Sequence, residues 1–240
     1  MRTSNPALGS RFERHAQIAH GQAMTVDGTV HKTGFLLLLV VLSSAVSWSY
    51  ATVETVSLWV FGGLIGGLIL AFATIFKPRW SPVTAPLYAL AEGCFLGVIS
   101  FYFNQAYPGL PIYALGLTLG TLLTMLMLYQ TGTIKVTDKL RSGIMMATGA
   151  IFLFYMASWV VGFFGVSMPL IHSSGTFGII FSLVVVGVAA FNLLLDFDFI
   201  EKASQQGAAR YMEWYGAFGL VVTLVWLYLE ILRLLAKLRE

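Results

Sequence analysis

The sequence from Val56 to Phe76, VSLWVFGGLIGGLILAFATIF, contains no Asp, Glu, Lys or Arg. Its length matches the ~20 residues that a helix needs to cross the hydrocarbon core of a bilayer. A helix is required rather than a barrel strand, because every backbone amide within lipid must find its hydrogen-bond partner inside its own segment. This stretch therefore predicts a membrane-spanning helix.

The same pattern recurs along the chain, which is 58% hydrophobic and only 10% charged. In a water-soluble domain, about a quarter of the residues are charged. Proline, glycine and charge separate seven hydrophobic segments: 34–52, 56–76, 83–103, 111–131, 143–164, 175–197 and 214–236. We therefore predict an all-α fold, a polytopic bundle of seven transmembrane helices over residues 34–240, after a flexible cytoplasmic tail over residues 1–33.

The basic residues predict the orientation, since Lys and Arg in short loops are retained in the cytoplasm. With the N-terminus inside, eleven of the fourteen basic residues are cytoplasmic: Arg2, Arg11, Arg14, Lys32, Lys77, Arg79, Lys135, Lys139, Arg141, Lys202 and Arg210. Arg233, Lys237 and Arg239 would then lie outside, and a six-crossing chain with a partly inserted last helix is the alternative. We expect a multi-pass protein of the cell inner membrane.

The sequence offers no catalytic, metal or nucleic-acid motif. Its histidines, His15, His20, His31 and His172, are not at metal-ligand spacing, and neither a glycine-rich phosphate loop nor a nucleophile elbow is present. No basic array interleaved with aromatic residues occurs. We expect no enzyme activity, no cofactor, no metal site and no nucleic-acid partner.

Ionisable residues inside the segments are the candidate functional residues, because a charge at membrane depth costs about 2.5–3.5 kcal/mol. Glu92 lies about 13 Å along the third segment, near the bilayer midplane. It is interpreted either as a protonated structural residue bonded to a neighbouring Ser, Thr or Tyr, or as an ion- or pH-sensing group.

Asp196, Asp198 and Glu201 gather at the inner end of the sixth segment. Carboxylates this close are expected to titrate as a coupled group. The functional interpretation is a proton sensor or a weak cation site. The alternative is a solvated helix end, which fits Asp198 and Glu201 better than Asp196, because a long uncharged run precedes Asp196.

The last segment carries Glu230 and Arg233, three residues apart and able to pair within one helix. With seven crossings both lie near the outer face, where a salt bridge between Arg233 and Glu54 is a second hypothesis. Small residues spaced four apart predict close helix contacts in the second and third segments. They are Gly62, Gly63, Gly66, Gly67, Gly93 and Gly97.

Two stretches, AFNLLLDFDFIEK at 190–202 and WLYLEIL at 226–232, resemble the end of the Bax inhibitor-1 family, in its bacterial YccA-like branch. The resemblance extends over about residues 25–238. It implies six helices around a central seventh, a pH-sensitive calcium leak, and a regulatory pair of aspartates on the last two helices. Asp196 matches the first aspartate. Glu230 matches the second by its Leu-Tyr-Leu context, whereas an alignment without an insertion places Thr223 or an apolar residue there.

The leading functional hypothesis is therefore a pH-sensitive cation leak channel for calcium, with Asp196, Asp198, Glu230 and Glu92 as the ion- or pH-sensing residues. The alternative is a regulatory membrane protein that binds another membrane protein, such as a membrane protease, through its N-terminal tail. The expected partners are membrane lipid, calcium ions and that membrane protein.

Overall fold

The structure is a computed structural model that describes residues 23–52, 55–164 and 175–240. In these ranges it contains seven long helices, each apolar enough to span a membrane. They are α2 (Val26–Ser49), α3 (Val56–Phe76), α4 (Ser81–Ala106), α5 (Leu110–Gln130), α6 (Asp138–Phe163), α8 (Thr176–Gln205) and α9 (Met212–Lys237), with a short 3-10 helix η1 (Pro78–Trp80) before α4. The predicted seven-helix membrane bundle is confirmed.

Helix α2 begins earlier than the end of the predicted tail. Thr25 caps it by accepting a hydrogen bond from the Gly28 amide at 2.9 Å, and Asp27 lies in the first turn, where a negative charge is favourable. Residues 26–33 are thus helical, and the predicted boundary at residue 33 is wrong because it followed the apolar run rather than the cap. Residues 1–22 of the predicted tail lie outside the described residues.

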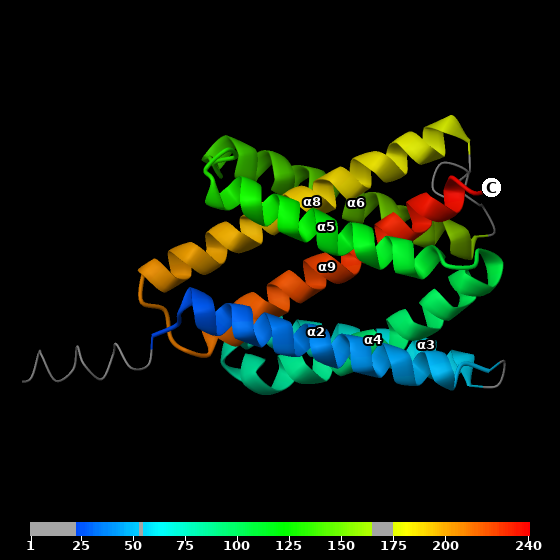
Figure 1. The fold of residues 1–240 in the computed structure, drawn as a ribbon, viewed down its shortest axis with the longest axis horizontal. Coiled ribbons are helices and arrows are strands. Elements are labelled where there is room, and N and C mark those ends of the chain that lie inside the picture. The colour runs from blue at the N-terminus through cyan, green and yellow to red at the C-terminus, as the bar shows by residue number, and fades with distance from the viewer. Residues whose placement is uncertain (1–22, 53–54, 165–174) are drawn as a thin grey trace, which may run out of the picture.

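The helices form two layers of three with α9 between them (Figure 1). One layer contains α2, α3 and α4, in which α4 packs against both of its neighbours. The other contains α5, α6 and α8, in which α8 packs against the other two. Helix α9 packs on α2, α4, α5 and α8, so the central helix is the last one of the chain.

Successive helices run in opposite directions, which gives the bundle two ends. The N-side is the end where α2, α4, α6 and α9 begin, and the C-side is the opposite end. Helix α9 reaches both ends: Glu213 contacts Lys32 of α2 on the N-side, and Lys237 donates a hydrogen bond to Ser182 of α8 on the C-side. The last helix therefore crosses the whole bundle, and the six-crossing alternative is wrong.

Glycines allow two close helix contacts, as their spacing predicted. A Cβ atom added at Gly93 of α4 would lie 2.5 Å from the carbonyl oxygen of Val40 in α2. One added at Gly63 of α3 would lie 2.7 Å from the carbonyl oxygen of Ala91 in α4. Since real Cβ atoms do not approach backbone oxygen so closely, these two glycines set how near the backbones of α2, α3 and α4 can come.

We predict that Gly93→Ala destabilises the protein although alanine is the better helix former. The added methyl group must push α2 from α4, and overpacking of this kind costs about 1–3 kcal/mol. Thermal unfolding in detergent measures the effect. Gly120→Ala in α5 is the matched control, because nothing lies within 4 Å of its added Cβ, and it should leave the Tm unchanged or raise it. Equal Tm values for the two variants would contradict the packing role of Gly93.

Candidate functional site

Asp196 lies at the contact between α8 and α9, inside the membrane-spanning part of the bundle. It is about 14 Å from the N-side end of α8 along the helix axis. The hydroxyl group of Thr223 in α9 donates a hydrogen bond of 2.6 Å to its carboxyl Oδ2. Among the described residues, Asp196 has no ion-pair partner. A carboxyl group held here by a single neutral donor is the central feature of the candidate site.

Thr223, and not Glu230, occupies the position opposite Asp196. Helix α9 is continuous from Met212 to Lys237, so Glu230 lies about 10 Å further along its axis than Thr223. Glu230 is therefore too far along α9 for a direct bond to Asp196, and its assignment as an ion- or pH-sensing residue stays a prediction. The alternative alignment, which has no insertion and places Thr223 at the second site, agrees with the structure.

Asp198 is buried, with an exposed fraction of 7%, and forms ion pairs with Arg141 of α6 and Lys202 of α8. The Lys202 pair joins Nζ to Oδ1 at 2.8 Å. The interpretation of Asp198 as a solvated helix end is therefore wrong. Glu201, by contrast, is exposed, and it accepts hydrogen bonds from Tyr129 and Gln205.

The predicted coupled cluster of carboxylates is divided between two faces of α8. Two residues along a helix turn the side chain by about 200°, so Asp196 faces α9 whereas Asp198 faces α6. The two carboxylates thus have different partners, and repulsion between them is not the force that controls either one.

Glu230 belongs to a polar group near the C-side, where it is 2% exposed. Arg233 donates to both carboxylate oxygens at 3.0 Å, which confirms the predicted pair within α9. The hydroxyl of Tyr155 in α6 also donates to Glu230, at 3.1 Å, and accepts from Arg233 at 2.9 Å. The hypothesised partner of Arg233, Glu54, lies outside the described residues.

Helix α6 joins the bundle along a seam that the sequence analysis missed. Arg141, Thr148 and Tyr155 recur every seven residues on one face, with Ile144 and Ile151 between them, which is the heptad pattern of a coiled-coil seam. The three polar members meet, in order, Asp198, Asn192 and Glu230. Their seven-residue spacing was the signal available in the sequence.

Glu92 lies on α4 where this helix packs against α3. A Cβ atom at Gly67 would lie 2.7 Å from the carboxyl Oε2 of Glu92, so the small residue in α3 leaves room for this carboxyl group. The structure gives Glu92 no hydrogen bond or ion pair with any residue that it describes, so the predicted bond to a neighbouring Ser, Thr or Tyr is not found. Glu92 and Asp196 are thus two membrane-embedded carboxyl groups without a cation.

Two buried charges at the ends of α9 were not singled out from the sequence. Glu213, which is 3% exposed, pairs with Lys32 and accepts hydrogen bonds from the amide and hydroxyl of Thr25 at 2.9 and 3.1 Å. Lys237 donates to Ser182 Oγ at 2.9 Å and to the carbonyl oxygen of Gly178 at 3.1 Å. Both residues stand at the limits of an apolar run, where sequence alone does not separate a solvated end from a buried contact.

The carboxyl groups of the candidate site lie apart from one another rather than in one cluster. Within the described ranges, no three His, Cys, Asp or Glu side chains are close enough to hold a metal ion together. Asp198, Glu213 and Glu230 each have at least one cation beside them. Among the described carboxyl groups that lie away from the helix ends, Asp196 and Glu92 have no cation beside them, so a proton gained or lost there would change the charge inside the membrane.

We predict that Lys32→Met lowers the free energy of unfolding by about 3–5 kcal/mol, because it leaves the buried Glu213 without its cation. Unfolding in mixed detergent micelles measures the loss. Lys135→Met, at an exposed lysine, is the control and should change stability little. The double variant Lys32→Met with Glu213→Leu should recover most of the loss, since no unpaired charge remains. A Lys32→Met protein as stable as the control would contradict this ion pair.

The chain matches a protein family described as Bax inhibitor 1 like over residues 5–240. The matched range includes all seven helices and the contact between Asp196 and Thr223. No curated protein and no solved structure matches the chain.

Proposed function

This chain belongs to the Bax inhibitor 1-like family, and from that premise we propose that it is a pH-sensitive cation leak channel. Calcium is the proposed cation, and the cytoplasmic membrane of a bacterium, with the YccA-like branch of the family, is the proposed setting. The observation that carries the proposal is the carboxyl group of Asp196, which lies inside the membrane between α8 and α9 and whose one hydrogen-bond donor among the described residues is Thr223.

The proposed switch is the proton on Asp196. A neutral carboxyl group is tolerated between two packed helices, whereas a charged one inside the membrane costs about 2.5–3.5 kcal/mol unless water or a cation reaches it. Loss of the proton therefore favours any arrangement of α8 and α9 that admits water. A two-state equilibrium biased in this way conducts more at high pH and less at low pH.

The remaining carboxylates have supporting roles in this proposal. Arg141 and Lys202 form ion pairs with Asp198, and the Arg141 pair holds α6 to α8. Glu230 pairs with Arg233 within α9 and accepts a hydrogen bond from Tyr155, which joins α9 to α6. Glu92 is the second candidate for a proton-dependent group, because it too has no cation and because α3, which it faces, packs mainly on α4.

We predict that Asp196→Asn abolishes most of the pH dependence of calcium flux into liposomes. Asparagine keeps the shape and the neutral charge of the protonated acid, so the flux should stay at the low value of acidic pH throughout. The wild-type flux should rise with pH, by at most about tenfold per pH unit for a single titrating group. A calcium-sensitive dye inside the liposomes measures both.

Glu201→Gln is the matched control, because it neutralises an exposed carboxylate on the same helix, and it should keep the wild-type pH profile. An unchanged profile in Asp196→Asn would reject Asp196 as the sensor. A wild type with no flux at any pH would reject the channel and favour the alternative, a regulatory protein that binds another membrane protein.

We also propose that the N-side of the bundle is cytoplasmic, since the loops after α3, α5 and α8 carry the basic residues. In a Cys94→Ala background, a membrane-impermeant thiol reagent added outside intact cells should label Pro108→Cys, between α4 and α5. It should not label Lys139→Cys at the start of α6 until the cells are opened. Labelling of Lys139→Cys in intact cells would reverse the orientation without affecting the channel hypothesis.

A further inference from the structure

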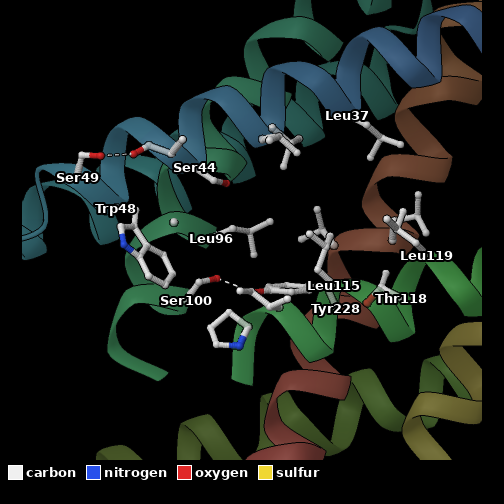
Figure 2. Close-up of a pocket in the computed structure, with 18 residues that line it drawn as sticks. Leu37, Ser44, Trp48, Ser49, Leu96, Ser100, Leu115, Thr118, Leu119 and Tyr228 are labelled. Carbon is white, nitrogen blue, oxygen red and sulfur yellow. Dashed lines mark hydrogen bonds between the residues drawn. The ribbon is translucent and has the colours of Figure 1, made fainter. Parts of the chain in front are cut away.

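A groove of about 430 Å³ lies between α2 and α5, with α4 and α9 as its floor. Helices α2 and α5 stand on either side of α9 and do not pack against one another along their length. Figure 2 shows side chains from both helices pointing into the space, with Leu37 and Trp48 of α2 far apart along it and Leu115, Thr118 and Leu119 of α5 on the opposite wall.

The walls are apolar and carry no Asp, Glu, Lys, Arg or His. The few hydroxyl groups are already bonded within the protein: Ser44 to the carbonyl oxygen of Gly93 at 2.9 Å, Thr118 to that of Ala114 at 2.8 Å, and Ser100 to the Tyr228 hydroxyl at 2.6 Å. A polar ligand would find few free partners there. Since apolar cavities do not hold water, the occupant must itself be apolar.

The groove is confined to one half of the membrane. On α2 it runs from Leu37 to Ser49, which is about 18 Å of helix, and all of it lies toward the C-side. One leaflet of a bilayer contributes about 15 Å of hydrocarbon. The groove is thus about as long as a single leaflet is thick, and Trp48, of a residue type enriched at membrane interfaces, lies near its C-side end.

We propose that this groove binds one acyl chain of a phospholipid in the C-side leaflet. The space is continuous with the lipid-facing surface, because exposed side chains such as Val41 and Leu119 form its edges. If the groove were empty, its walls would lose the dispersion contacts that an occupant supplies. A side chain from a helix of a neighbouring protein is too short to extend along the whole groove. The acyl chain lies along α2, with its carbonyl end near Trp48 and its methyl end near Leu37.

The absence of charge in the lining sets the specificity. The groove contacts the hydrocarbon and not the headgroup, so lipids with neutral and with anionic headgroups should occupy it equally well. Binding of the acyl chain does not depend on ion conduction, because it follows from the shape and chemistry of the groove alone.

Photo-crosslinking tests the proposal with the full chain in phosphatidylcholine vesicles. Two probes carry a diazirine on the acyl chain, one close to the carbonyl and one close to the terminal methyl, and mass spectrometry of peptides locates the adducts. The first probe should label α2 and α5 near Trp48 and Ile112, and the second near Leu37 and Leu119. Repeating the experiment with phosphatidylglycerol probes should give the same pattern.

Ala45→Phe is the test variant, because Ala45 lines the groove and a phenyl group there would fill it. Adducts on the groove should fall about tenfold, equivalent to 1.4 kcal/mol of binding. Val46→Phe is the matched control: it sits at the same depth on α2, is 49% exposed and does not line the groove, so it should leave the labelling unchanged. Thermal unfolding of both variants confirms that they fold.

Three results would overturn the proposal. The first is labelling of the exposed α3 face at Leu68 and Ile69 as strong as that of the groove. The second is a reversed depth order for the two probes, and the third is equal labelling in Ala45→Phe and Val46→Phe.

Discussion

The cost of placing a charge in hydrocarbon is the constraint on which the rest of this bundle depends. Lys32 and Glu213 join α2 to α9, Asp198 joins α8 to α6, and Lys237 joins α9 back to the start of α8. Each of these contacts neutralises or solvates a charge and at the same time fixes one helix end against another. In a membrane, where lipid tails are as apolar as leucine, such contacts and close packing, including that at glycines, take the place of the hydrophobic effect as the force that associates helices.

The fold was almost wholly predictable from the sequence, because the hydrocarbon thickness dictates both the length and the apolar character of each helix. The spans from Val56 and from Leu110 were placed to within a residue or two at both ends. The errors fall at charged ends. Helix α2 begins at a Thr cap and α8 continues through Asp198 and Lys202 to Gln205, since a charge that forms an ion pair does not end a helix.

The candidate site was less predictable, because hydropathy reports depth in the membrane but not the face on which a side chain lies. Asp196 and Asp198 have nearly the same depth, and only the packing of α8 between α6 and α9 separates their partners. For Glu230 the motif suggested the family's second aspartate position, whereas the rise of a continuous helix places Glu230 too far from Asp196 for a direct bond. The distance along α9 was a better guide to the contacts of Glu230 than the local sequence pattern.

The packing of α8 explains why protonation of Asp196 would affect helix contacts across the bundle. From nearly the same turn, Asp196 contacts α9 while Asp198 holds the N-side end of α6. Further along the same seam, Asn192 bonds to Thr148, and α6 then reaches Glu230 of α9 through Tyr155. A movement of α8 away from α9 must therefore either carry α6 with it, which breaks the hydrogen bond between Tyr155 and Glu230, or break the ion pair between Arg141 and Asp198. Since breaking a buried ion pair costs several kcal/mol, the two helices of this layer are expected to move together.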